Sequence, residues 1–390
     1  MPTTDTIRPL HRLAFAQPAA PRRTTLPDGN PAWLFSRYTD VRFIINHATF
    51  RRAPLPAPDA DTTNLVDAPD AVANQHDDQH LRLRRAIQRA FSPRAIARMA
   101  PWVAGVVDQL LDTLVDHGPS VDLVTHYTQP LPIAVMRRLT GVHEVDDTRL
   151  LHWAEHAFAG ATTDLAKTAE ATQEFTDFTI ELLAQRRRAP GPDLISSLVQ
   201  AADDEGGITE PQLVNLVSTL VVGGHDTAMT MLSNSLLYLL DERPEVWARL
   251  GSDEAAAGLL TERMLHLIPL GDPDERPNPL QATEDIEVGG VALRAGEIAV
   301  VDRAAANRDP AAFSDDPFSD LFAPLENPTL AFGGGRHYCP GTWLARTELQ
   351  LGLHRLAARL PGLHLTTSAD AVEWRLGTIT RSPLHLPATW

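Results

Sequence analysis

The chain contains one apolar segment that is long enough to cross a whole domain as a single helix. It extends from Thr209 to about Leu240, and about 31 residues at ~1.5 Å per residue give a length of ~46 Å. Thr209 and Gln212 have the spacing of a capping box, and Pro211 suits a first helical turn. The segment therefore predicts a long helix with a sharply defined start, which any fold of this chain has to accommodate.

Most other segments also have a helical pattern, and strands are confined to small regions. Apolar residues recur at helical spacing from Asp40 to Ala48 and in Leu81–Phe91, Ala95–Leu114, Leu131–Leu139, Thr148–Ala159, Leu165–Arg187, Asp193–Ala202, Pro244–Leu250, Glu254–Leu267 and Thr342–Leu360. Strands are predicted at Ile286–Val288, Val291–Leu293 and Glu297–Val301. We expect a mainly α fold with a small β region, in one large domain of residues 1–390 whose minor β part comes from 1–50, 283–301 and 362–390.

Composition and charge exclude several classes of protein. The chain has 34 basic and 50 acidic side chains and a formal net charge of −16, which argues against nucleic acid as a partner because phosphate binding needs a positive surface. A single cysteine excludes an intramolecular disulfide and an iron–sulfur cluster held by this chain alone. The sequence contains neither a signal-peptide core nor an apolar window of roughly 18 residues, so we expect a soluble, cytoplasmic protein that does not span a membrane.

One short histidine motif suggests a metal. His152, Glu155 and His156 match the H-x-x-E-H pattern of some zinc proteases, in which two imidazoles one helical turn apart bind the ion. The flanking apolar residues indicate an ordinary amphipathic helix instead, and we favour that interpretation.

The lone cysteine lies in a glycine-rich loop. Gly333, Gly334 and Gly335 precede Cys339, and they would let the backbone approach another group closely. Pro340 is predicted at the first position of the helix that follows, where its missing N–H costs nothing. A cysteine at a helix N-terminus is favoured as a thiolate. The alternative is a buried structural cysteine, and the loop by itself leaves both interpretations open.

Three motifs in this chain resemble those of the cytochrome P450 family. The family's haem loop, F-G-x-G-x-[HR]-x-C-x-G, is matched at Phe332, Gly333, Gly335, His337, Cys339 and Gly341. Gly223–Thr227 in the long helix is similar to the oxygen-activation signature [AG]-G-x-[DE]-T, and His80–Arg85 is similar to the H-x-R-x-R-R helix. The resemblance covers essentially the whole chain and is closest to the bacterial type.

The resemblance implies haem b, iron protoporphyrin IX, as the cofactor. Cys339 would be the thiolate ligand of the iron, with Phe332 packed near the sulfur and Gly341 completing the loop. His80, Arg84 and His337 would bind the two haem propionates, for which a guanidinium can offer paired hydrogen bonds.

The long helix would supply the oxygen-activating residues. Gly223 and Gly224 would interrupt this helix with a groove where the backbone opens to hold oxygen and water, and the resemblance implies that Asp226 and Thr227 deliver protons. Glycine in a helix costs about 1 kcal/mol against alanine, which suggests that the two glycines are there for a reason. For Thr227 the alternative is a hydroxyl that bonds the carbonyl oxygen four residues earlier.

Three arginines expected from the family are replaced by apolar residues. With the E-x-x-R motif placed on Glu262, the replacements are Leu265, Phe318 and Leu280. Loss of both arginines beside one glutamate suggests that packing replaces an ionic network. We hypothesise that Glu262 is protonated, or pairs with Arg303 or Arg308.

The implied activity is that of a monooxygenase. It would activate O2 to hydroxylate or epoxidise a small organic or natural-product substrate, with electrons from NAD(P)H through a separate ferredoxin and ferredoxin reductase. An alternative is oxidative C–C, C–N or C–O cross-linking of an aromatic peptide or natural product. A further alternative is a non-catalytic haem-binding or sensor protein. Family topology places the substrate walls at Ala53–Ala73, Phe158–Leu165, near Val221, Leu270–Asp272 and Ile379–Thr380.

Overall fold

The structure is a computed structural model, and it describes residues 8–13, 17–26, 28–53, 68, 70–159, 164–271, 279–313 and 316–390. The chain forms two compact units. The first, which we call the sheet unit, comprises Met1–Pro56 and Asp253–Cys339, and the second, the helical unit, comprises Ala57–Ser252 and Pro340–Trp390. Most of the described residues are helical and the sheets are small, as the sequence predicts.

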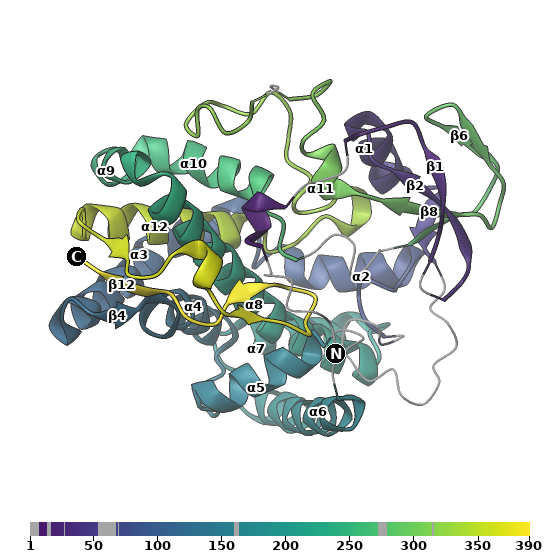
Figure 1. Cartoon of the computed structure of the whole chain (residues 1–390). Coiled ribbons are helices and arrows are strands. Elements are labelled where there is room, and N and C mark those ends of the chain that lie inside the picture. Colours follow the sequence, from purple (N-terminus) through teal and green to yellow (C-terminus); the bar gives the residue numbers. More distant parts are fainter. Residues whose placement is uncertain are drawn as a thin grey trace. The chain divides into compact units, whose positions relative to one another are not determined.

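The sheet unit is organised around a five-stranded sheet with the strand order β1-β2-β8-β5-β3. Its strands are β1 (Arg22–Thr25), β2 (Pro31–Phe35), β3 (Phe50–Arg52), β5 (Leu280–Ala282) and β8 (Ile298–Val301). β2 and β8 run parallel, and the other pairs are antiparallel. Figure 1 shows β1, β2 and β8 side by side, so the first fifty residues and the region near 300 meet in one sheet.

Helix α1 (Tyr38–Asn46) supplies the core that covers this sheet. Tyr38, Val41 and Ile44 lie on its buried face and join Phe35 of β2 and Ala299 of β8 in one apolar cluster. The same unit contains η1 (Leu10–Arg12), α10 (Glu254–Leu267), α11 (Arg303–Ala306), η3 (Gly335–His337) and the hairpin β6 (Ile286–Val288)–β7 (Val291–Leu293). Gly289 and Gly290 turn the hairpin with φ values of 60° and 83°, a conformation that glycine adopts without strain.

The buried polar face of α10 begins one residue later than the sequence register predicts. Arg263 and His266, three residues apart, are 2% and 3% exposed, whereas Glu262 is half-buried and lines a surface pocket with the loop 323–328. Arg263 donates to the carbonyl of Ala323 at 3.1 Å. A cationic and a neutral basic side chain therefore occupy the i, i+3 positions where the resemblance implies a glutamate and an arginine.

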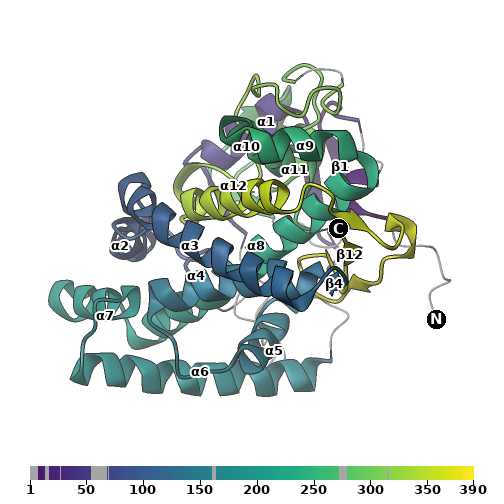
Figure 2. The same ribbon diagram turned by 90° about the vertical axis from the view of Figure 1, so that its left-hand side faces the viewer.

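The helical unit contains the long helix and the helices packed on it. They are α2 (Asp77–Gln88), α3 (Pro93–His117), the π-helical turn η2 (Val124–Thr128), α4 (Pro130–Thr140), α5 (Asp147–Ala157), α6 (Leu165–Arg188), α7 (Leu194–Glu205), α8 (Glu210–Glu242), α9 (Pro244–Ser252), α12 (Thr342–Arg359) and the short η4 (Ala369–Ala371). Figure 2 shows α3 beside α12, and α6 running along α5 and α7.

Helix α8 has the predicted capping box and is buried on almost every side. Thr209 Oγ1 accepts from the Gln212 backbone N–H at 3.4 Å, and Gln212 Oε1 accepts from the Thr209 N–H at 3.1 Å. The helix packs on α4, α5, α6 and α12. Because no broad face meets water, the polar side chains in its middle have to find partners inside the protein.

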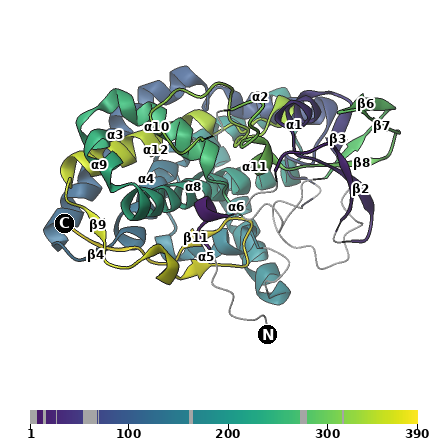
Figure 3. The same cartoon turned by 45° about the horizontal axis from the view of Figure 1, so that its top comes forward.

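The C-terminal strands form small sheets within the helical unit. β12 (Pro387–Thr389) pairs with β4 (Val121–Asp122) and β9 (His364–Leu365), and β10 (Trp374–Arg375) pairs with β11 (Ser382–Pro383). Figure 3 shows these strands lying against the helices of this unit. The strands of 362–390 therefore do not belong to the sheet that contains β1 and β8.

The predicted helices and strands are found with small differences at their ends. Glu254–Leu267, Ile286–Val288 and Val291–Leu293 have the predicted bounds. The π-helical turn η2 was not predicted, because a five-residue turn between two helices leaves no periodic signal of its own. Of the predicted loop Ala53–Ala73, residues 54–67 and 69 lie outside the described residues.

Acidification should destabilise the protein through His266. Neither ring nitrogen has a hydrogen-bond partner in the described part of the chain. Burial, and then the charges of Arg263 and Arg308, lower the pKa of His266 to about 3, against about 6.5 in an unfolded chain. The unfolded state therefore binds the extra proton. The stability gained by keeping the ring neutral is complete above about pH 6.5 and falls by about 1.4 kcal/mol per unit as the pH drops toward 3.

We expect His266→Leu to flatten the fall in the free energy of unfolding between about pH 6.5 and about pH 4.5. The exposed His364 supplies the control, because His364→Gln removes a histidine that is open to solvent. Urea unfolding at several pH values measures the slope, and equal slopes for wild type and His266→Leu would contradict the assignment.

Candidate functional site

The glycine-rich loop of the sheet unit presents Cys339. The Cys339 N–H donates to the Phe332 carbonyl at 3.0 Å, and the Tyr338 N–H donates to the Gly335 carbonyl at 3.2 Å, which closes the loop around the turn η3. Cys339 is partly exposed and is in no disulfide. The loop thus brings Phe332, His337 and Cys339 together, as the motif predicts.

The glycines of this loop are required by its approach to α1. At Gly335, φ is +57°, and a Cβ there would lie 2.5 Å from the backbone oxygen of Ile45. A Cβ on Gly334 would lie 2.7 Å from the Ile45 side chain. The Gly335 N–H also donates to Asn46 Oδ1 at 2.8 Å. The C-terminal end of α1 therefore supports the loop, and side chains at these glycines would displace it.

The prediction that Pro340 occupies the first helical position is wrong. Helix α12 begins at Thr342 with Gly341 as its N-cap, and the first helical hydrogen bond joins the Ala345 N–H to the Gly341 carbonyl at 2.9 Å. Pro340 therefore precedes the cap. The Gly341 carbonyl accepts the first helical hydrogen bond, so Gly341 is the N-cap. Pro340 lies one residue before it, outside the helix.

His80 and Arg84 lie on α2 of the helical unit. They are one helical turn apart, so they share a face of the helix. His80 is 1% exposed and Arg84 is half-buried. Because His80 is buried and Arg84 is half-buried, this face of α2 is directed toward the protein interior and is not a solvated basic helix face.

The two glycines of α8 have different surroundings. The helix continues without interruption through Gly223 and Gly224, so the predicted opening of its backbone is not observed. A Cβ on Gly224 would overlap Sδ of Met136 on α4, whereas one on Gly223 would meet only Phe158 Cζ at 3.9 Å. Gly224 is therefore explained by close helix packing, and Gly223 leaves free space next to Phe158.

Thr227 bonds back to its own helix. Its Oγ1 donates to the Gly223 carbonyl at 2.7 Å, which is the alternative that the sequence left open. The hydroxyl oxygen keeps its acceptor lone pairs in this arrangement. Thr227 can therefore still accept a hydrogen bond at Oγ1 while its own hydrogen is directed at Gly223.

Asp226 is held by two side chains of the C-terminal hairpin. Its carboxylate is 1% exposed, with Oδ1 2.6 Å from Arg375 Nη1, and Oδ2 accepts from Thr380 Oγ1 at 2.9 Å. Arg375 Nη2 donates to Thr380 Oγ1 at 3.0 Å. We call Asp226, Arg375 and Thr380 the Asp226 triad. Sequence reasoning missed Arg375, because nothing in the local pattern links it to a residue so far along the chain.

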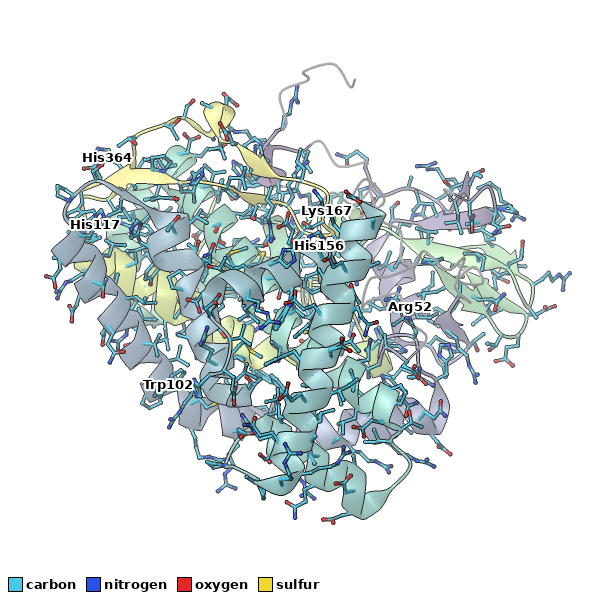
Figure 4. The ribbon with its side chains drawn as sticks, turned by 90° about the horizontal axis from the view of Figure 1, so that it is seen from below. Arg52, Trp102, His117, His156, Lys167 and His364 are labelled. Carbon is cyan, nitrogen blue, oxygen red and sulfur yellow. The ribbon has the colours of Figure 1, made fainter. Side chains whose placement is uncertain are left out.

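The H-x-x-E-H motif does not form a metal site. His156 is 8% exposed, its Nδ1 lies 3.2 Å from Thr168 Oγ1 of α6, and its ring is 4.8 Å from that of His152. Burial, and then His152, lower the pKa of His156. Figure 4 shows His156 beside Lys167 where α5 meets α6. Among the described residues, no three His, Cys, Asp or Glu side chains are grouped to bind a metal.

The loop residues fit a haem. A thiol outside any disulfide is the soft donor that haem iron accepts. The bare backbone at Gly333 leaves room beside the loop, whereas Ile45 of α1 fills the space at Gly334 and Gly335. Arg303 lies next to the loop, with Nη1 3.6 Å from where a Cβ of Gly333 would be, and burial lowers its pKa. A haem propionate could accept hydrogen bonds from this guanidinium. The apolar side chain of Leu280 in β5 cannot donate a hydrogen bond to a propionate.

None of the helices in the described part of the chain has the length and apolar character needed to cross a bilayer.

Comparisons with known proteins point to one family. A family model described as cytochrome P450 matches residues 277–360. Nocardicin C N-oxygenase of Nocardia uniformis subsp. tsuyamanensis is 38% identical over 97% of this chain and 94% of its own length. The LnmA cytochrome P450 hydroxylase of the leinamycin biosynthetic pathway of Streptomyces atroolivaceus is similar in structure, with a TM-score of 0.84 and 35% identity over 94% of this chain and 92% of that chain. Cytochrome P450mel 107F1, described as having biaryl coupling reactivity, has a TM-score of 0.83 and 31% identity over 93% and 91% of the two chains.

A methyl group should be costly at residue 224 and tolerated at residue 223. In Gly224→Ala the new Cβ meets Met136, and overpacking of this kind costs about 1–3 kcal/mol. Gly223→Ala is the matched control, because both variants gain about 1 kcal/mol of helix propensity and only one has the clash. Urea unfolding measures the difference, and equal stabilities would contradict the packing argument.

A double-mutant cycle tests whether the Met136 side chain is what limits the size of residue 224. We expect Gly224→Ala and Met136→Ala together to cost less than the sum of the two, by about 1 kcal/mol or more, because removing the Met136 side chain makes room for the methyl group. Additive costs would show that another group limits residue 224.

Proposed function

The chain belongs to the cytochrome P450 family, and on that premise we propose that it is a haem-thiolate monooxygenase that oxidises a small organic or natural-product substrate. The observation that carries this proposal is Cys339, the lone cysteine, which lies partly exposed and outside any disulfide in the glycine-rich loop. Residues 1–390 then form one P450 domain. The named relatives, an N-oxygenase and a hydroxylase of natural-product pathways, support this reaction class.

The haem would be held by residues of the glycine-rich loop and of helix α2. Cys339 would be the iron ligand, and Phe332 and the backbone of the loop 333–341 would surround its sulfur. His337, His80 and Arg84 would bind the propionates. When bound, the haem supplies a thiolate-ligated iron at which dioxygen is activated.

The residues of α8 would manage the protons. Insertion of one oxygen atom into a substrate consumes O2, two electrons and two protons, and the second oxygen leaves as water. We assign Asp226 as the carboxylate that passes protons inward, and Thr227 as the hydroxyl that accepts a hydrogen bond at Oγ1 and so positions the group that carries the proton. Gly224 lets α8 pack closely where these residues begin.

Electrons would come from NAD(P)H through a ferredoxin and its reductase. The resemblance to the bacterial type supports this assignment, and the protein would then lie in the cytoplasm, where the reduced nicotinamide is available. The substrate would be a small molecule or a peptide.

A second candidate is oxidative cross-linking of an aromatic substrate, which is favoured by one observation. The structurally similar P450mel 107F1 is described as having biaryl coupling reactivity. A haem-binding sensor without turnover is less well supported, because it would have no use for Asp226 paired inside the protein beside Thr227.

Replacing the sulfur tests the cofactor assignment. We expect Cys339→Ser to lose the red-shifted Soret band that the reduced carbon monoxide complex shows with a cysteine thiolate ligand, because a serine oxygen is a harder donor. Arg336→Gln in the same loop is the control and should keep the band. A wild-type protein that binds no haem, or an unchanged band in Cys339→Ser, would overturn the proposal.

Removing the hydroxyl of Thr227 tests the proton assignment. With styrene as a probe substrate and a surrogate ferredoxin system, we expect Thr227→Ala to lower epoxide formation by roughly 100-fold, the lower range for a positioned proton donor. Electron consumption should continue, with hydrogen peroxide as the product. Thr230→Ala, a buried threonine one turn further along α8, is the matched control. Unchanged epoxide per electron pair in Thr227→Ala would contradict the role.

A further inference from the structure

One short segment near the C-terminus joins the Asp226 triad to the end of α5. Residues 376–381 connect β10 to β11, and Gly377 turns the chain with a φ of +82°. The Ile379 N–H donates to the Phe158 carbonyl at 2.9 Å, and Thr378 forms a β-bridge with Ala159. We call residues 376–381 the coupling turn.

The coupling turn is fixed firmly at both ends. Thr378 Oγ1 donates to the Thr380 carbonyl at 2.6 Å, so the turn has an internal brace. Asn234 Nδ2 on α8 donates to the Arg381 carbonyl at 2.9 Å. Thr378, Thr380 and Arg381 are all buried. A displacement at Phe158 would therefore be passed to Thr380 and Asp226 and not absorbed by a loose loop.

The contact between Arg375 and Asp226 differs from a simple structural ion pair. Oδ1 of Asp226 lies 2.6 Å from Nη1, yet no N–H points at it closely enough to make a hydrogen bond. The guanidinium donates to Thr380 and contacts Asp226 as an ion pair, instead of holding the carboxylate with two parallel hydrogen bonds. Arg375 therefore acts on Oδ1 through its charge, and it acts on Oδ2 through Thr380.

We propose that Arg375 and Thr380 are positioning residues that orient the Asp226 carboxylate for proton delivery. We also propose that the coupling turn links this orientation to the position of the C-terminal end of α5. Arg375 touches neither substrate nor haem in this role, since it acts through Asp226. A substrate that pushes on Phe158, next to the free space at Gly223, shifts the carboxylate through Ile379 and Thr380. The proposal rests on the proposed function, because only a chain that activates oxygen needs a proton source at Asp226.

Arg375→Lys is the main test, because lysine keeps the charge but cannot serve Asp226 and Thr380 in one planar group. Thr380→Val removes the other partner. Arg359→Lys is the control, because Arg359 lies on α12 outside the coupling turn and pairs with Asp112 at 2.9 Å near the surface.

Two oxidants distinguish a positioning role of Arg375 and Thr380 from general damage to the structure, with styrene as the probe substrate. The oxygen route needs protons: styrene, O2, two electrons and two protons give styrene oxide and water. Iodosylbenzene needs none, because it transfers its oxygen atom to styrene and leaves as iodobenzene. We expect Arg375→Lys and Thr380→Val to lower epoxide formation from O2 by roughly 10- to 100-fold, the effect of misplacing a reacting group by about 1 Å. With iodosylbenzene both should retain the wild-type rate within about twofold.

The outcomes separate this inference from the proposed function. If Thr227→Ala loses O2-dependent epoxidation while Arg375→Lys behaves like Arg359→Lys, the positioning role is overturned and the proposed function stands. If Arg375→Lys loses both routes equally, Arg375 is structural and the inference is overturned. If Thr227→Ala and Asp226→Asn are both unaffected, the proposed function fails first. Loss of the oxygen route alone in Arg375→Lys and Thr380→Val supports the inference.

Discussion

A carboxylate in a helix that is buried on almost every side has to be paired, and the Asp226–Arg375 contact meets this requirement. Removing one member of such a pair leaves a charge in the interior, which costs about 3–5 kcal/mol. The partner comes from β10 and not from a helix packed on α8. This need brings the C-terminal hairpin back to the middle of the long helix, and the neighbouring bond from Asn234 to the Arg381 carbonyl holds it there.

Two buried hydroxyl groups of α8 have neutral partners. Ser233 meets Thr128 at 2.7 Å, and Ser218 meets Thr179 at 3.0 Å, each hydroxyl pair joining α8 to a different neighbour. Neutral hydroxyls cost less to bury than a charge, so they can be satisfied by helices that pack there for apolar reasons. Asp226 is buried as a carboxylate in the middle of the helix, and its charged partner comes from the C-terminal hairpin.

The sequence predicted the parts of this site that are local and missed those that are not. The haem loop is ten residues long and its glycines, histidine and cysteine are read directly, as are the capping box of α8 and the bounds of α10. The triad joins residues 154 positions apart, Asp226 and Thr380, which no periodicity links. On α10 the pattern gave the helix but not its rotation. A shift of one residue turns a helix by about 100°, so Arg263 and His266 face inward where Glu262 was expected.

The glycines of α8 show why a motif match and its physical cause have to be established separately. The pair Gly223-Gly224 matches the family signature, and its cost in helix propensity suggested a broken helix. The helix is intact, and the cost is offset at Gly224 by packing against Met136. That contact fixes where α4 crosses α8, while Gly223 leaves space beside Phe158. Asp226 lies two residues after Gly224. The crossing of α4 and α8 that Gly224 permits therefore also determines where along α8 the Arg375 guanidinium contacts Asp226.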